Sequence, residues 1–379
     1  MKYYLIAGEA SGDLHGSNLM KSIRVNDPDA EFRYYGGDLM QAQGGSLVRH
    51  YRDTAVMGFV RVVMHAKTIL KNIQQCKEDI KLYQPDAVIL IDYPGFNLQI
   101  ARYVKEKLSI PVFYYIPPKI WAWKTSRVKL IRKYIDRVYA IFPFEPGFYA
   151  KFACEAVYVG NPTVESVSRA HTCSMADFLK KNSLPDKKII ALLPGSRKQE
   201  VGLTISVLNE IDFTQFEGYQ CVMAATSAVD MRMYQPAINK GIRIVYDQTY
   251  DLLANASIAI VNSGTATLEA ALFNVPQIVC YPIRIPGVLY DFGRKYMIKI
   301  PYISLVNIIA NKQVVKELLA YQFSAKNTIS ELKKIIQNDE YRNLMMSDYR
   351  QISSNLGSSV ASDIASHDII STIKKQSLQ

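Results

Sequence analysis

The chain has 379 residues, a formal net charge of +11, 49% hydrophobic residues and 21% charged residues. This chain is longer than one that usually forms a single hydrophobic core, so it suits two domains. The composition is that of a folded protein. The positive charge is compatible with nucleic acid, anionic lipid or phosphorylated substrates. The sequence carries no nucleic-acid-binding motif beside its charge, so we expect no nucleic-acid partner.

The five cysteines are widely and irregularly spaced, without a CxxC pair, and the five histidines are scattered. These patterns favour a reducing compartment and argue against zinc, so we expect neither a metal nor another cofactor. The apolar run at the N-terminus is too short for a signal peptide, and no stretch of about 18 apolar residues exists. We therefore expect a cytoplasmic protein whose contact with a membrane is peripheral.

Short apolar runs, each followed by turn residues and a helical pattern, recur along the chain. They cover residues 2–7, 87–92, 112–116, 137–142 and 156–159, and then 188–193, 220–225, 242–246, 257–261 and 277–281. Continuous apolar runs are typical of strands buried on both faces of a parallel sheet, and their alternation with helices indicates βαβ units. The predicted fold class is α/β, with two Rossmann-like doubly wound domains.

The turn residues Gly160-Asn161-Pro162 end the first set of runs and predict the domain boundary. We expect an N-terminal Rossmann-like domain over 1–162 and a C-terminal Rossmann-like domain over 163–340. Residues 341–379 form a polar helical tail that we expect to pack back on the first domain or on a partner subunit.

The first run ends in Ala7-Gly8-Glu9-Ala10-Ser11-Gly12-Asp13-Leu14-His15. Glycines here allow a tight turn and close approach to a ligand, although the GxGxxG dinucleotide fingerprint is absent. One interpretation is a plain loop in which Ser11 or Asp13 caps the next helix. Three titratable groups within seven residues favour a cleft loop in which Glu9, Asp13 and His15 face a sugar.

Asp92 stands at the end of the second run, in Leu90-Ile91-Asp92-Tyr93-Pro94. A carboxylate at the end of a buried strand is suited to accept a hydroxyl proton as a general base. The alternative is an aspartate that caps the following helix.

Both tryptophans, Trp121 and Trp123, lie beside a dense basic cluster that includes Lys119, Lys124 and Arg127 and continues to Lys133. Aromatic side chains beside cations suit a membrane interface or a phosphorylated lipid headgroup. They also suit RNA stacking, and a solvated basic helix with core tryptophans fits equally well.

Two loops in the second half have the pattern of a phosphate site. Gly195-Ser196-Arg197 follows one strand and opens a helix, and Ser263-Gly264-Thr265 does the same further along, with Glu269 early in its helix. Helix N-termini hold phosphate through backbone N–H groups, and arginine grips it bidentately. Two such loops on one sheet predict a diphosphate site, with Glu269 placed to bind ribose hydroxyls.

Two further stretches are apolar. Residues 56–64 include Met57 and Phe59, and residues 281–302 interleave apolar side chains with Arg294, Lys295 and other cations. Apolar residues with flanking cations fit an interfacial surface that admits acyl chains, although a buried core helix is the commoner explanation for the first stretch.

Taken in order, these motifs resemble the lipid-A-disaccharide synthase family. The resemblance runs from about residue 4 to residue 322 and includes Phe142-Pro143-Phe144-Glu145 and Tyr302-Ile303-Ser304-Leu305-Val306-Asn307. It implies a GT-B architecture, in which two Rossmann-like domains face across a cleft. It also implies a metal-independent, inverting transfer of 2,3-diacylglucosamine from its UDP donor to 2,3-diacylglucosamine 1-phosphate, giving a β(1→6) disaccharide 1-phosphate and UDP at the inner face of the cytoplasmic membrane.

The resemblance also implies roles for individual residues. The donor side would hold Gly195, Ser196, Arg197, Ser263, Gly264, Thr265, Glu269 and Asn307. The catalytic set would be Asp92, Glu9 and Asp13, with Asp92 as the favoured base. Acceptor or lipid contacts are expected from Ser11, Gly12, Met57, Phe59, Trp121, Trp123, Arg294 and Lys295.

This chain departs from the family pattern at two positions. Gly95 stands where an aspartate is common, which removes one rival to Asp92, and Asn161 stands where a histidine is expected. Expected partners are the two acylated sugars and an anionic membrane surface, with a homodimer as a further expectation. The alternatives are a UDP-sugar 2-epimerase of the same architecture and a non-catalytic RNA-binding protein that uses the basic cluster.

Overall fold

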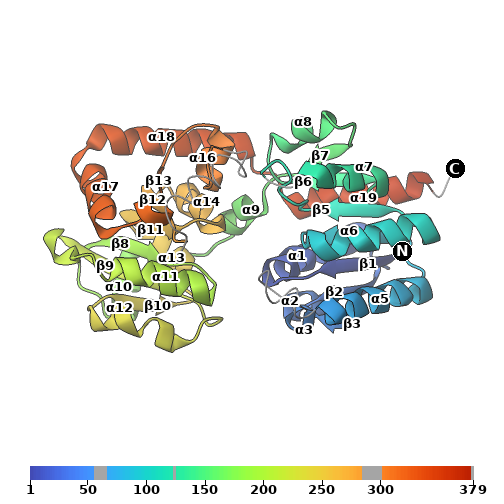
Figure 1. Cartoon of the computed structure of the whole chain (residues 1–379), viewed down its shortest axis with the longest axis horizontal. Helices are drawn as coiled ribbons and strands as arrows, with labels where there is room; N and C mark the ends of the chain where they lie inside the picture. Colours follow the sequence, from blue (N-terminus) through green and yellow to red (C-terminus); the bar gives the residue numbers. More distant parts are fainter. Residues whose placement is uncertain (55–65, 123–124, 284–300, 377–379) are drawn as a thin grey trace. The chain divides into compact units, whose positions relative to one another are not determined.

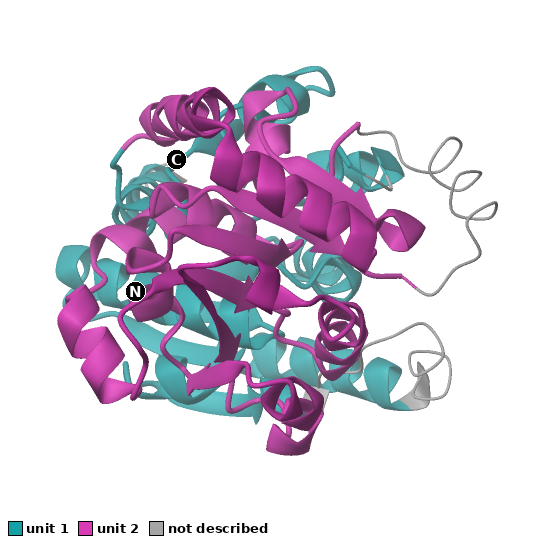
Figure 2. Ribbon diagram, turned by 90° about the vertical axis from the view of Figure 1, so that its left-hand side faces the viewer, with its two compact units in different colours: residues 1–162, 358–379 teal, residues 163–357 magenta. Residues whose placement is uncertain are grey.

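The computed structural model describes residues 1–54, 66–122, 125–283 and 301–376. It divides into two compact units. Unit 1 comprises Met1–Pro162 together with Ser358–Gln379, and unit 2 comprises Thr163–Gly357. Figure 2 colours the two units separately. No helix within the described residues is long and apolar enough to cross a membrane.

Unit 1 is built on a seven-stranded sheet of order β3-β2-β1-β4-β5-β6-β7, in which every neighbouring pair is parallel (Figure 1). Its strands are β1 (Lys2–Ala7), β2 (Glu31–Gly36), β3 (Ser46–His50), β4 (Ala87–Ile91), β5 (Val112–Tyr115), β6 (Arg137–Ala140) and β7 (Ala156–Tyr158).

Alternate residues of these strands enter two separate hydrophobic clusters. Tyr4 and Ile6 of β1 belong to one, and Tyr3 and Leu5 belong to the other. Successive strand residues point to opposite faces, so both faces of the sheet are covered. This burial explains why the strands are continuous apolar runs, and it confirms the predicted doubly wound class.

The helical segments of unit 1 connect these strands. They are α1 (Ala10–Asn26), α2 (Asp38–Gln41), α3 (Tyr51–Thr54), α5 (Ala66–Tyr83), α6 (Pro94–Tyr103), the π-helix η1 (Val104–Leu108), the 3-10 helix η2 (Thr125–Arg127), α7 (Val128–Tyr134), α8 (Glu145–Ala150) and α19 (Ala361–Gln376).

Helix α19 returns from the far end of the sequence to pack beside α1. Ala361, Ala365 and Ile369 are fully buried in the cluster that includes β1 and α1. Its polar side is tied down as well, because Arg137 of β6 forms an ion pair of 2.8 Å with Asp368. The end of the chain is therefore an integral layer of unit 1.

Unit 2 has a six-stranded sheet of order β10-β9-β8-β11-β12-β13, again parallel throughout. Its strands are β8 (Lys188–Leu193), β9 (Tyr219–Ala225), β10 (Arg243–Tyr246), β11 (Ile258–Asn262), β12 (Gln277–Tyr281) and β13 (Lys316–Leu319). Its helical segments are α9 (Pro162–Ser168), α10 (Met175–Lys181), α11 (Lys198–Leu208), η3 (Phe213–Gln215), η4 (Met231–Met233), α12 (Gln235–Asn239), α13 (Thr249–Ala254), α14 (Thr265–Leu272), α16 (Leu305–Ala310), η5 (Ala320–Gln322), α17 (Ala325–Gln337) and α18 (Asp339–Leu356).

The expected tail over 341–379 is not one structural body. Helix α18 belongs to unit 2, where Tyr349 is buried and its hydroxyl is 3.3 Å from the Gln277 amide nitrogen of β12. Only the residues after Gly357 join unit 1. The two helices bury apolar faces of their own, so each packs on a different sheet.

Both sheets reverse their strand order beside their first strand, between β1 and β4 in unit 1 and between β8 and β11 in unit 2. Doubly wound sheets bind ligands at such switch points, outside the carboxyl ends of the strands. The fold therefore marks two places where functional residues should gather, one in each unit.

Candidate functional site

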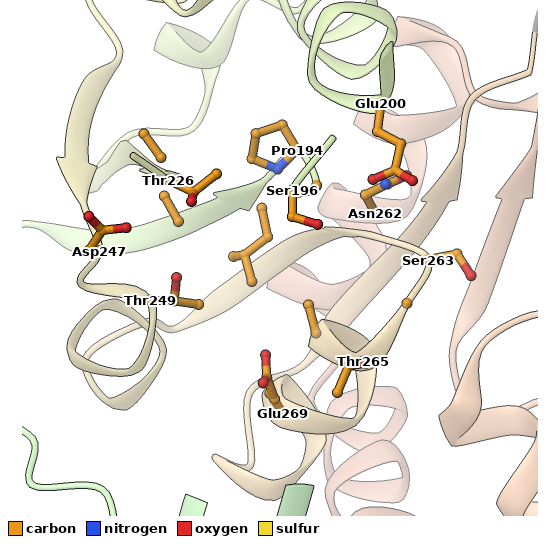
Figure 3. A pocket seen from close by; sticks show the side chains of 16 residues that line it. Pro194, Ser196, Glu200, Thr226, Asp247, Thr249, Asn262, Ser263, Thr265 and Glu269 are labelled. Carbon is orange, nitrogen blue, oxygen red and sulfur yellow. The ribbon is translucent and has the colours of Figure 1, made fainter. Parts of the chain in front are cut away.

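The switch point of unit 2 holds a cavity of about 340 Å3 at the carboxyl ends of β8, β9 and β11, bordered by the chain after β10 (Figure 3). This volume is in the range of small-molecule sites. The lining residues are Leu193, Pro194, Gly195, Ser196, Glu200, Ala224, Ala225, Thr226, Asp247, Thr249, Asn262, Ser263, Gly264, Thr265, Ala266 and Glu269. Both loops that the sequence marked for phosphate binding meet here.

The turn after β8 depends on a glycine. Gly195 has φ +107°, and a Cβ at this position would lie 2.7 Å from both Asn262 Nδ2 and Glu200 Oε2. Gly195 therefore lets the turn pass close to the end of β11 and to the first turn of α11. Figure 3 shows Glu200 and Asn262 side by side on this wall.

Arg197 lies at the edge of this turn rather than in the cavity wall. It is the residue before α11, its side chain is exposed, and its guanidinium pairs with Glu200 at 3.2 Å. Glu200 does line the cavity. Arg197 must therefore exchange this surface ion pair for a ligand before it can grip a phosphate there.

The turn after β11 carries the second marked loop. Asn262 is 4% exposed, and its Oδ1 atom has no hydrogen-bond partner among the described residues. Gly264 precedes α14 and has nothing within 4 Å of a Cβ built on it. The first N–H groups of a helix lack partners within the helix and attract anions, so this turn offers hydrogen-bond donors beside a buried acceptor.

Glu269 projects from the second turn of α14. Tyr250 donates a hydrogen bond of 3.0 Å to its Oε1 atom, and burial raises the pKa of the Glu269 carboxyl while this hydrogen bond opposes the rise. The side chain is held in one orientation on the cavity wall (Figure 3). A carboxylate so fixed is suited to accept hydrogen bonds from hydroxyl groups.

Asn307 is not part of this cavity wall. It is fully buried, and its amide donates to the carbonyl of Val315 and to Glu317 Oε1 at 2.9 Å each. Its Oδ1 accepts from the backbone N–H groups of Val314 and Val315. The amide is thus used within the fold to join α16 to β13, and these contacts favour a structural role over the expected donor contact.

At the switch point of unit 1, the chain turns sharply after β4. Asp92 and Tyr93 are consecutive non-glycine residues in the left-handed region, with φ 44° and 48°. The Asn97 amide donates a 2.7 Å hydrogen bond to the Asp92 carbonyl, and the Tyr114 hydroxyl donates another of 2.8 Å. Such strained backbone persists only where its surroundings hold it, and it is concentrated at functional sites.

The side chain of Asp92 is therefore displayed by a fixed turn. Burial raises the pKa of its carboxyl, and the positive charge of Lys119 and a backbone hydrogen bond from Tyr93 oppose the rise. A carboxylate with a raised pKa is a stronger base than an ordinary aspartate. The geometry thus supports the interpretation of Asp92 as a base.

The loop after β1 packs against this turn. A Cβ on Gly8 would lie 2.3 Å from the ring of Tyr93, and one on Gly12 would lie 3.2 Å from Ala7. Gly8 is therefore needed for packing beneath Tyr93, whereas a side chain at Gly12, at the start of α1, would only be tight against Ala7. Glu9 precedes α1, and Ser11 is exposed on its first turn.

The contacts of Asp13 differ from those expected of a catalytic carboxylate in an open cleft. Its carboxylate is 3% exposed and accepts backbone hydrogen bonds from Gly37, Leu39 and Met40 at 2.8–3.0 Å. These bonds hold the turn that begins α2. A carboxylate occupied by three amides is poorly placed to take a substrate proton, so its contacts favour a structural role over a catalytic one.

Trp121 is half-buried and packs against other aromatic side chains of unit 1. Its ring meets Phe142 and Phe144 edge-on, and its indole N–H donates to the buried Glu145 at 3.0 Å. Glu145 also accepts from the backbone N–H groups of Ile141 and Phe142. These contacts favour the core interpretation of this tryptophan over a lipid-facing one.

Some predicted residues lie outside the described part of the chain. They are Met57, Phe59, Trp123, Arg294 and Lys295. Among the residues that the structure does describe, no group of three His, Cys, Asp or Glu side chains is arranged to hold a metal ion.

Sequence reasoning gave no role to Asn97, Tyr114, Glu145 or Asn262. Glu145 stands inside the motif Phe142-Pro143-Phe144-Glu145, and the proline that follows it is a signal for a helix start. Asn97 lies three residues after Pro94, and Asn262 lies between the predicted run 257–261 and the second phosphate loop. Tyr114 carries no signal, because it looks like one more residue of a buried strand.

Solved structures share this architecture. S. aureus MnaA, in a co-structure with UDP, has a TM-score of 0.65 at 13% identity, covering 98% of this chain and 96% of that chain. UDP-GlcNAc 2-epimerase from Neisseria meningitidis, bound to UDP-GlcNAc, has a TM-score of 0.59 at 12% identity over 99% and 100% of the two chains. The fold is that of the GT-B class of glycosyltransferases and epimerases.

Sequence comparison then gives the family. The family model for lipid-A-disaccharide synthetase matches residues 3–369. Lipid-A-disaccharide synthase from Syntrophus aciditrophicus is 35% identical over 98% of this chain and 97% of that protein. The chain belongs to the lipid-A-disaccharide synthase family and is a glycosyltransferase of lipid A synthesis.

Proposed function

We propose that the protein transfers 2,3-diacylglucosamine from its UDP conjugate to the 6-hydroxyl of 2,3-diacylglucosamine 1-phosphate. The products are the β(1→6) disaccharide 1-phosphate and UDP. Inversion follows if an α-linked donor is displaced from the opposite face in one step. We place the reaction at the inner face of the cytoplasmic membrane, where acylated sugars are available to a peripheral enzyme.

UDP is assigned to the cavity of unit 2. The observation that carries this assignment is the turn after β11. Among the described residues, a glycine without close neighbours precedes a helix N-terminus there, and a buried amide oxygen has no hydrogen-bond partner. The diphosphate would lie against the N-termini of α11 and α14, with Arg197 recruited from Glu200. The unpaired Oδ1 atom of Asn262 is suited to accept a hydrogen bond from an N–H or O–H group of the nucleotide, and Glu269 from the ribose hydroxyls.

The chemical step requires one base and one stabilised leaving group. Asp92 takes the proton of the acceptor 6-hydroxyl as the oxygen bonds to the anomeric carbon, and the bond from that carbon to the diphosphate breaks. The helix dipoles and Arg197 stabilise the charge that develops on UDP. These groups supply positive potential from the chain itself, so we propose that no metal is needed.

The direct test is to incubate purified protein with both acylated sugars in detergent and to identify the lipids by mass spectrometry. A disaccharide 1-phosphate formed together with one UDP per turnover is expected. Formation of a 2-epimer of the donor sugar instead would overturn the proposal. RNA binding without any turnover would overturn it as well.

The base is tested by Asp92→Asn, which keeps the size of the side chain but cannot take a proton. Turnover should fall about 10²–10⁴-fold. The melting temperature and UDP affinity should stay near wild-type values, because the cavity assigned to UDP is built from unit 2 residues alone. Near-normal turnover would move the search for the base to Glu9 and His15.

A further inference from the structure

A second groove lies in unit 1 between α7 and the chain that follows α8. It encloses about 740 Å3 and is lined by Thr125, Ser126, Val128, Lys129, Arg132, Lys133 and Phe152. None of these residues takes part in the chemistry described above. We call this feature the α7 groove.

The charge of the α7 groove has one sign. Lys129, Arg132 and Lys133 line it, and no carboxylate does. None of the three forms an ion pair within the part of the chain that the structure describes. The sequence from 107 to 135 contains neither aspartate nor glutamate. Glu106, one residue before this stretch, interacts electrostatically with Lys133, and its carboxylate also accepts hydrogen bonds from Arg102 and from the Tyr134 hydroxyl. The three cations therefore outnumber the carboxylates beside the groove.

A larger groove in unit 2 shows that this imbalance is not a general consequence of the basic composition. It encloses about 950 Å3 at the opposite end of its sheet from the nucleotide cavity. Its charged lining residues are Lys187, Lys240, Arg243, Glu210, Asp212 and Glu217, three of each sign. The same number of cations is there balanced by carboxylates.

The α7 groove also has an apolar part. Val128 and Phe152 line it, and the neighbouring Leu130 of α7 is 40% exposed. Unpaired cations around an apolar floor match a phosphate-bearing headgroup joined to hydrocarbon. The phosphates of RNA would match the cations, but RNA offers no hydrocarbon chain for the exposed leucine to contact.

We propose that the α7 groove docks the protein on a bilayer by binding the headgroups of anionic phospholipids. This surface would hold the enzyme where its acylated substrates lie, and in that respect it rests on the proposed function. It is separate from the catalytic groups, because α7 carries neither the proposed base nor a residue of the nucleotide cavity.

The test is binding of the full chain to phosphatidylcholine vesicles with and without phosphatidylglycerol, measured by co-sedimentation at low and high salt. The test variant replaces Lys129, Arg132 and Lys133 with glutamine. The control replaces Lys187, Lys240 and Arg243 with glutamine, which changes the net charge equally. Each cation near an anionic surface is worth about fivefold in affinity, so the test variant should bind about 100-fold more weakly.

The control variant should bind nearly as wild type, and both variants should keep their turnover of detergent-dispersed substrate. Leu130→Ser, at a position that is 40% exposed, should reduce the part of the binding that resists salt, and its melting temperature checks that the variant is folded. Equal loss in the two charge variants, or no loss in the first, would overturn the proposal. Binding of an RNA oligonucleotide in place of vesicles would overturn it too, and detergent turnover reports separately on the proposed function.

Discussion

Gly264→Ala tests whether Gly264 is required by the fold of the free protein or by the bound diphosphate. Gly264 has φ 166°, an extended conformation that any residue adopts, and an added Cβ would meet no atom within 4 Å. The free protein should therefore accept alanine at the cost of a poorer helix N-cap, below about 1 kcal/mol. We expect a small shift in melting temperature.

The bound state should respond differently. The new methyl group would stand before the N-terminus of α14, where we place the diphosphate. Displacing one charge-assisted hydrogen bond costs about 1.5–3 kcal/mol, which corresponds to roughly 10- to 150-fold in the dissociation constant of UDP. Titration calorimetry with UDP measures this loss directly.

Gly195→Ala is the matched comparison, because it adds the same methyl group to the other phosphate loop. Here φ is +107° and the Cβ collides with side-chain atoms of Asn262 and Glu200, so strain of about 1–3 kcal/mol should destabilise the free protein. If Gly264→Ala kept full UDP affinity, the diphosphate would not lie at α14. If it were as unstable as Gly195→Ala, our account of its surroundings would be wrong.

Two further predictions concern charged side chains. Arg197→Ala should weaken UDP binding about tenfold with little effect on stability, whereas Glu200→Gln should strengthen it by removing a competing ion pair; calorimetric affinities that move the other way would refute this. Burial raises the pKa of Glu145 to about 7, against about 4.3 in an unfolded chain. The contribution of Glu145 to the free energy of unfolding is therefore complete below about pH 4.3 and is lost as pH rises through 7. Urea unfolding should show Glu145→Gln losing more stability relative to wild type near pH 5 than near pH 8, and an equal loss at both would contradict the shift.

The apolar runs predicted most strands of the two sheets, because strands in a parallel sheet are buried on both faces and are therefore apolar throughout. Three strands escaped this pattern: β2, β3 and β13. In β2 the charged Arg33 interrupts the apolar sequence, and it is accommodated by a hydrogen-bonded ion pair with Asp79 of α5 at 2.6 Å. β3 and β13 are edge strands whose residues are only partly apolar. Pairing with β2 and with β12, respectively, decides their structure.

The site could be predicted as a set of loops but not as a set of contacts. The two phosphate loops meet in one cavity because both follow strands beside the same switch point, which the order of motifs allows one to infer. The roles of Asp13 and Asn307 could not be inferred in this way. Each side chain is used by backbone groups that only the tertiary fold brings near, Gly37 and Met40 for Asp13 and Val314 for Asn307.

The distribution of charge changes how the basic composition should be understood. A net charge of +11 is compatible with phosphorylated substrates, yet the charged residues that line the nucleotide cavity are Glu200, Asp247 and Glu269. Side-chain charge alone would repel a diphosphate there, so the proposed binding depends on backbone N–H groups at helix N-termini and on the exposed Arg197. Three cations that form no ion pair among the described residues stand instead around the α7 groove. The positive charge of that groove is therefore better explained by attraction to an anionic surface than by recognition of the nucleotide.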